Sequence, residues 1–277
     1  MAQLHSLRDS FAIGRVFGIQ IRVHLLFPLI LAFVLMQGLS QPGASMGDAF
    51  YLIVAVFMLF GVVFLHELGH SLVAQAFGIQ VLDITFWPLG GMARMAELPE
   101  KPRVEGLVAI AGPAVNGVLF TAGLGLHLIL GLPLELNTLP GYFVYINLAM
   151  GAFNLIPAFP MDGGRILRAW LARSKPNRRD WVQATAIAVN VGRFFAFLMI
   201  LAGTYSCVLA LIGVWVWWMG ARELWAVRMK HKAQRFYDEA NYPGSEMGGS
   251  TPGFTPEDLQ KLESFRGQLK GFGRDKD

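Results

Sequence analysis

The segment AFYLIVAVFMLFGVVFLHELGHSLVAQAF, residues 49–77, decides the fold of this chain. Its apolar length exceeds the roughly 20 residues that a helix needs to cross the hydrocarbon core of a bilayer. Near its end stand His66, Glu67 and His70. Ionisable side chains inside a membrane helix are costly and mark functional sites. The segment therefore predicts a membrane helix that carries a chemical site.

The residues from His66 to His70 form the pattern H-E-x-x-H. Side chains four residues apart lie on one face of a helix, so the two imidazoles project toward a common point and can bind zinc there. Glu67 follows the first histidine directly, and its carboxylate can serve as general base toward the attacking water. The alternative is an accidental match in an ordinary buried helix. The cost of these three side chains in an apolar helix argues against it.

Composition also predicts a polytopic membrane protein. Of its 277 residues, 54% are hydrophobic and 15% are charged, and the mean hydropathy is +0.47, which is too apolar for an ordinary soluble domain. The single cysteine, Cys207, cannot form an internal disulfide or a sulfur-rich metal site, so a metal must use histidine and carboxylate. Membrane topology explains the net charge of +4, and we expect no nucleic-acid partner.

Six apolar stretches fit the hydrocarbon core, and we expect a membrane all-α fold of six transmembrane helices with a broken fourth helix. The stretches are residues 23–40, 49–77, 104–131, 141–157, 182–202 and 204–223. Lysine and arginine are missing from the connections 41–48 and 132–140 but are frequent in 163–181 and after Arg222. Because such residues collect on the cytoplasmic side, we expect both termini in the cytoplasm. The histidines, roughly 25 Å from the outer end of their helix, then lie in the cytoplasmic third of the bilayer.

A catalytic zinc usually keeps three protein ligands and one open position, so a third donor is needed. The fourth apolar stretch ends in NLIPAFPMDGG, residues 154–164. Its prolines disfavour helix and its two glycines permit a tight turn, so Asp162 should lie on irregular backbone between two half-helices. We take Asp162 as the candidate third ligand. The alternative is that it only caps a following helix over 163–172.

These residues resemble the site-2 protease family of intramembrane zinc metalloproteases, specifically its compact six-span prokaryotic branch. The resemblance extends over roughly residues 10–225. It implies that His66 and His70 bind Zn2+, with Glu67 as the base. The pattern N-x-x-P-x-x-P-x-D-G then supplies Asp162 as the third ligand.

Two asparagines and one loop extend the resemblance. Asn154 is similar to the family asparagine that positions the substrate backbone or stabilises the oxyanion, and a helix-packing amide is the alternative. Asn116, after Gly112 and Pro113, resembles a signature in which small residues let helices approach closely, and we expect a structural role before a substrate-positioning one. Residues 81–95 resemble a small re-entrant β element between helices two and three, whose edge can bind an extended substrate. A simple interfacial loop is the alternative there.

The resemblance implies an integral protein of the prokaryotic plasma membrane, whose partners are the lipid bilayer and a membrane-spanning protein substrate. An anti-sigma factor or a tethered transcription-factor precursor is such a substrate. Some relatives carry PDZ or CBS domains, for which we expect no room here. We expect residues 1–225 to form the protease domain and 226–277 a polar tail with a short amphipathic helix from Thr255 to Leu269. Whether the chain forms a homo-oligomer stays open.

Two rival functions fit the same ligands. Prenyl-protein endopeptidases also place H-E-x-x-H in a membrane helix but take a glutamate as third ligand. A metal transporter or membrane metal sensor would use the ligands to line a path or a switch, without breaking a bond. Glu67 beside His66 favours hydrolysis over transport.

Overall fold

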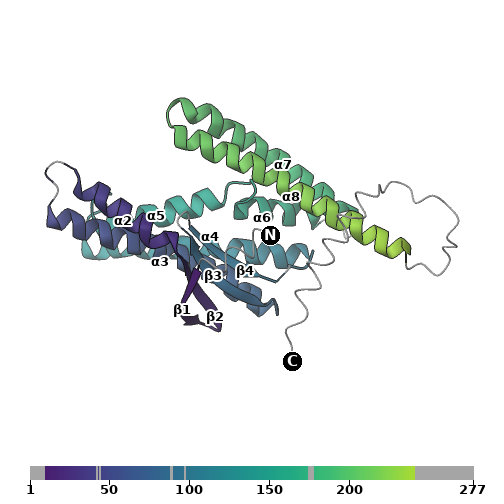
Figure 1. Ribbon diagram of the computed structural model, residues 1–277, viewed down its shortest axis with the longest axis horizontal. Coiled ribbons are helices and arrows are strands. Elements are labelled where there is room, and N and C mark those ends of the chain that lie inside the picture. Colours follow the sequence, from purple (N-terminus) through teal and green to yellow (C-terminus); the bar gives the residue numbers. More distant parts are fainter. Residues whose placement is uncertain are drawn as a thin grey trace. The chain divides into compact units, whose positions relative to one another are not determined.

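The computed structural model describes residues 10–41, 43, 45–87, 90–96, 98–173 and 178–240. In order, the elements are β1 (Ser10–Val16), β2 (Ile19–His24), α2 (Leu26–Leu39), α3 (Met46–Ala76), β3 (Val81–Trp87), β4 (Gly90–Met95), α4 (Pro102–Leu130), α5 (Leu139–Asn154), α6 (Asp162–Ala172), α7 (Arg178–Leu201), the short 3-10 turn Ala202–Thr204, and α8 (Cys207–Ala240). The chain divides into two compact units, Met1–Glu223 and Leu224–Asp277. Helix α8 begins in the first unit and ends in the second (Figure 1).

Within the part of the chain that the structure describes, four helical segments are long and apolar enough to cross a membrane. They are Met46–Ala76, Pro102–Leu130, Trp181–Thr204 and Cys207–Phe236. At 1.5 Å per residue, the 31 residues of α3 extend over about 46 Å, more than the roughly 30 Å of a hydrocarbon core. Ser45 and Asp48 form a capping box that satisfies the first amides of α3. The chain is therefore an integral membrane protein.

The other two predicted spans coincide with shorter helices. Helix α2 has 14 residues and α5 has 16, which correspond to about 21 and 24 Å, less than the thickness of the hydrocarbon core. All six apolar stretches are thus helical, but six spans stay a prediction.

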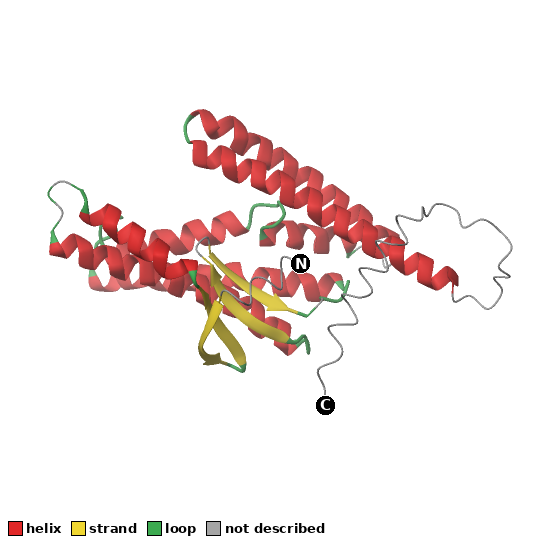
Figure 2. Cartoon of the chain, viewed as in Figure 1, coloured by secondary structure: helices red, strands yellow, loops and turns green. Residues whose placement is uncertain are grey.

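A sheet of four strands lies among the helices, in the order β1-β2-β3-β4 (yellow in Figure 2). Strands β1 and β2 are antiparallel, β2 and β3 are parallel, and β3 and β4 are antiparallel. The strand prediction over 81–95 matches β3 and β4, which form a hairpin. The sheet is larger than expected, because β1 and most of β2 come from the segment before the first apolar stretch.

The sequence of the β1–β2 hairpin carries two signals of its structure, an alternation of buried residues and a turn. Ile19, Ile21 and Val23 are buried while the residues between them are more exposed, the period of two that a half-buried strand requires. Phe17 and Gly18 both have positive φ, 51° and 79°, as a two-residue hairpin turn of the primed kind demands. Strand β2 packs with β3, α3 and α4 around one hydrophobic core, whereas β1 is mostly exposed.

The break predicted in the fourth apolar stretch is present, although its crossing of the membrane stays a prediction. Helix α5 ends at Asn154, and residues 155–161 form turns before α6 begins at Asp162. Asp162 follows irregular backbone, as expected, and is the first residue of α6. It does not cap that helix, because the N-cap residue is Met161 and no side chain makes a cap hydrogen bond. The break is what turns the carboxylate of Asp162 away from the line of α5 and back toward α3.

Two features near the C-terminus complete the fold. The Arg193 guanidinium of α7 lies 5.4 Å from the Trp217 ring centroid of α8 and donates to Asn190, so it faces a neighbouring helix. Helix α8 continues to Ala240, well past residue 226, where we expected the polar tail to start. The predicted amphipathic helix from Thr255 to Leu269 lies outside the described residues.

Candidate metal centre

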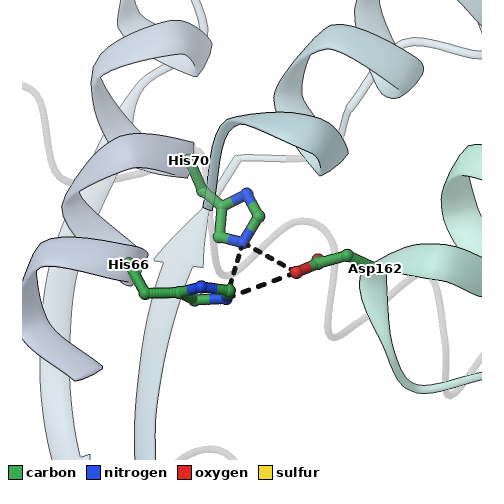
Figure 3. Close-up of side chains that lie close together, drawn as sticks. All are labelled: His66, His70 and Asp162. Atoms are coloured by element: carbon green, nitrogen blue, oxygen red, sulfur yellow. Dashed lines mark hydrogen bonds and ion pairs between the residues drawn. The ribbon is translucent and has the colours of Figure 1, made fainter. Parts of the chain in front are cut away.

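Three side chains from two distant segments converge on one point. Nε2 of His66 and Nε2 of His70 lie 3.2 Å apart. Oδ2 of Asp162 lies 3.3 Å from the first and 3.1 Å from the second. All three residues are buried. Figure 3 shows the two imidazoles reaching from α3 and the carboxylate reaching from the start of α6.

The glycines around this point explain how the segments come so close. A Cβ added to Gly163 would collide with the carbonyl oxygens of Leu155 and Ile156, and one at Gly164 would lie 2.8 Å from the Phe159 amide nitrogen. Only glycine lets the turns after α5 fold back over the first turn of α6. Local sequence thus fixes where Asp162 starts its helix.

Helix α4 passes directly behind the imidazoles at Gly112. A Cβ at that position would lie 2.6 Å from Cε1 of His70 and 2.7 Å from Cε1 of His66, both closer than any real contact. The small residue that resembled a helix-packing signature therefore makes room for the two ligands themselves. Backbone of α4 also reaches the site, since the Val108 carbonyl accepts a hydrogen bond from Nδ1 of His70 at 2.6 Å.

The donor set fits a tetrahedral zinc ion. With bonds of about 2.0–2.1 Å, two ligand atoms of such an ion are separated by about 3.3 Å, close to the three distances observed. A carbonyl can only accept, so Nδ1 of His70 carries the hydrogen and Nε2 presents a lone pair. Nδ1 of His66 likewise faces the amide oxygen of Asn116, at 2.6 Å. Three electron-rich atoms thus meet in a buried space, an arrangement that a cation stabilises.

Glu67 lies on the next face of α3 and is only half-buried. Its Oε2 accepts a hydrogen bond from the Ala93 amide of β4 at 3.3 Å. Among the described residues, one group of three potential metal donors was found, and it consists of His66, His70 and Asp162. The carboxylate of Glu67 is not part of this group. That separation is what a general base needs, because it leaves the carboxylate free to accept a proton.

The two predicted asparagines lie in different places. Asn116 is completely buried between His66 and Asn147 of α5. Asn154 is half-buried at the end of α5, and its Nδ2 donates to the Met150 carbonyl of its own helix at 3.0 Å. The substrate-positioning role of both stays a prediction.

Sequence reasoning missed a buried ionic cluster behind α6. Arg168 donates to Glu105 of α4 and, at 2.7 Å, to Glu223 of α8, while its guanidinium lies 4.9 Å from the Phe159 ring and 5.2 Å from the Trp181 ring. Burial opposes its charge, but the carboxylates, Glu105 foremost, raise the pKa of Arg168 above its ordinary value. The cluster ties α6, which carries a metal-site carboxylate at its start, to its neighbours. Glu105 and Arg168 stand at ordinary helix positions, so sequence spacing alone carried no signal of their pairing.

Comparison with known proteins agrees with this site. The sequence model of peptidase family M50 matches residues 54–133 and 132–199, which include all three donors and Glu67. A zinc metalloprotease of Methanocaldococcus jannaschii is 36% identical over 219 residues, covering 77% of this chain and 60% of that protein. Stage IV sporulation protein FB of Bacillus subtilis is 27% identical over 168 residues, covering 58% of this chain and 54% of that protein. The chain thus spans less than two thirds of the length of these relatives.

The fold has a counterpart among solved structures. The site-2 protease from Methanocaldococcus jannaschii superposes with a TM-score of 0.55 and 34% identity, covering 78% of this chain and 95% of that one. The chain belongs to peptidase family M50, the family of the site-2 proteases.

Proposed function

We propose that this protein is an intramembrane zinc metalloprotease that cuts membrane-spanning protein substrates. The observation that carries the proposal is the convergence of His66, His70 and Asp162 at zinc-like spacing beside Glu67, with both histidines on a helix long enough to cross the bilayer. A peptide bond inside a membrane is otherwise shielded from water, so an enzyme that cuts it needs a buried site that can activate one.

Zinc held by His66, His70 and Asp162 would polarise the scissile carbonyl and acidify the attacking water. The carboxylate of Glu67 accepts a proton from that water while the water oxygen attacks the carbonyl carbon. When the C–N bond breaks, Glu67 returns the proton to the leaving amine, so that it ends the cycle ionised as it began. Asn154, at the mouth of the same break in α5, orients the peptide by hydrogen bonding.

Strand β4 is the proposed docking edge for the substrate. It is the last strand of the sheet, and its Ala93 amide points away from β3 toward Glu67. Gly91 brings the strand close, since a Cβ there would lie 2.8 Å from Val63 and 3.0 Å from Cγ of Glu67. A helix hides its own amides, so a substrate segment must be extended to be cut, and an edge strand beside the base can hold it extended.

A proline at position 93 tests the hydrogen bond that this edge donates to Glu67. Ala93→Pro removes an N–H that lies outside the β3 ladder, which an edge strand tolerates. We expect cleavage of a transmembrane reporter to fall about tenfold, the value of one hydrogen bond to a charged group, with zinc content unchanged. Ala93→Gly keeps the N–H and serves as the control. Equal rates for the two variants would show that the edge amide takes no part.

The spans and orientation belong to the same proposal. Leu29, Phe33 and Met36 form an apolar stripe along α2, each more than half exposed, which lipid contact explains. We propose six membrane crossings, with α2 and α5 as the short ones, and both termini in the cytoplasm as the basic residues indicate. Cleavage then takes place near the cytoplasmic side and releases a cytosolic product.

Removal of the metal tests the activity itself. We expect purified protein in lipid vesicles to cleave a transmembrane reporter, to lose this activity completely after treatment with a zinc chelator, and to regain it with added zinc. Product mass would be read by mass spectrometry. Zinc uptake into the vesicles without any cleavage would contradict the proposal and indicate a transporter.

A further inference from the structure

A line of buried amides leads away from the candidate metal centre into α5. Nδ1 of His66 lies 2.6 Å from Oδ1 of Asn116, Nδ2 of Asn116 lies 3.1 Å from Oδ1 of Asn147, and Nδ2 of Asn147 lies 2.8 Å from the Phe143 carbonyl oxygen. Asn116 is 0% exposed and Asn147 is 1% exposed, so water does not compete for these bonds. The line joins three helices, α3, α4 and α5.

The backbone carbonyl at the end of this line sets the direction of every bond in it. The Phe143 carbonyl can only accept, so Asn147 must turn its NH2 group toward it and its oxygen toward Asn116. Asn116 then donates its own NH2 group to Asn147 and turns its oxygen toward His66. That oxygen can only accept, so the hydrogen of the His66 imidazole must lie on Nδ1. The lone pair is left on Nε2, the atom that faces His70 and Asp162.

We propose that Asn147 is a positioning residue of the metal centre, which acts through Asn116 to hold His66 in the tautomer that binds zinc. This inference rests on the zinc site proposed above and deepens it. Both histidines then carry the hydrogen on Nδ1 and the lone pair on Nε2, but different groups hold them in this form. His70 donates Nδ1 directly to the Val108 carbonyl, whereas His66 reaches a backbone carbonyl through two side chains. Hydrogen bonds to the outer nitrogen of a ligand imidazole orient the ring and raise its basicity.

Without Asn147, the Asn116 amide loses the partner that orients it. Its NH2 group would be buried without an acceptor, and rotation of the amide would then be favourable. A rotated amide presents N–H to His66, which requires the lone pair on Nδ1 and moves the hydrogen to Nε2, where it blocks the metal. The predicted consequence is weaker zinc binding at an otherwise intact site.

The experiment compares zinc affinities of the full-length protein, purified in detergent, by competition with a chelator of known affinity. Asn147→Leu keeps the size of the side chain but breaks the line of amides, and we expect zinc affinity to fall about 10–100-fold. Asn147→Ala should show the same loss and serves if the leucine variant does not fold. Val144→Ala is the control, since Val144 is a buried residue of α5 outside the line, and it should leave the affinity unchanged.

A second background separates tautomer control from packing. An ionised aspartate at 116, in Asn116→Asp, has no hydrogen to donate and can only accept from His66, whatever stands at 147. We therefore expect Asn147→Leu to cause no further loss of affinity in the Asn116→Asp protein. An equal loss in both backgrounds, or no loss in the native one, would overturn the inference while leaving the zinc site intact. Failure of the unaltered protein to bind zinc would instead overturn the proposed function.

Discussion

Glu67→Gln is expected to reduce cleavage of a transmembrane reporter by about 10²–10⁴-fold while zinc stays bound. Glutamine has nearly the same shape and can still accept from the Ala93 amide through its oxygen, so the local structure should survive. It cannot take a proton from water, and the reaction loses its base. The measurement is reporter cleavage in lipid vesicles, together with zinc content of the same preparation.

Glu135→Gln provides the matched control, because Glu135 is an exposed carboxylate in the connection between α4 and α5. It should cleave the reporter like the unaltered protein. Full activity of Glu67→Gln would remove Glu67 from the mechanism. If that variant lost both cleavage and zinc, Glu67 would be needed to form the site rather than to catalyse the reaction.

Asp162→Ala should lose most of its bound zinc and all detectable cleavage. The variant leaves two imidazoles without the carboxylate that completes the set, and it removes the negative charge that offsets the charge of the ion. The fall in zinc affinity should exceed roughly 10–100-fold, which is the usual effect of removing a residue that only hydrogen-bonds to a metal ligand. Metal content after dialysis against a chelator measures it.

Asp48→Ala is the comparison variant, since it removes an exposed carboxylate from the capping box at the other end of α3. It should retain zinc and activity. Full zinc occupancy in Asp162→Ala would mean that another residue is the third ligand, as in the prenyl-protein endopeptidases. The three ligands are buried, so a change to an exposed carboxylate such as Asp48 should not reproduce the loss of zinc and cleavage.

Elements dominated by a local pattern could be predicted from sequence. Each of the six apolar stretches is helical, and Pro157 with Pro160 marked the break after α5 correctly. The β1–β2 hairpin was not predicted, although Ile19, Ile21 and Val23 alternate as a strand should. Its pairing with β3 joins segments about 60 residues apart, and such a contact has no signature in either segment alone.

Some residues of the site could likewise be predicted from local spacing, whereas others depend on helix packing. Helical periodicity brings His66 and His70 together, and it does so in any helix that contains them. Asn147 lies seven residues before Asn154 on an apolar helix, and a polar side chain in such a helix was a signal we did not use. Its link to Asn116 depends on how α4 packs against α5, which the small residues Gly123 and Gly151 permit.

The sequence by itself determined that the chain lies in a membrane, that two imidazoles and a base share one helix, and that a break precedes Asp162. These follow from interactions within a few residues, namely burial in lipid, helical spacing and the backbone limits of proline and glycine. The tertiary structure decided that the carboxylate meets the imidazoles at 3.1–3.3 Å, that Glu67 lies against an edge strand, and that amides on α4 and α5 orient His66. Those distances depend on the packing of helices remote in sequence, and close packing of their side chains sets them only once all the helices are in place.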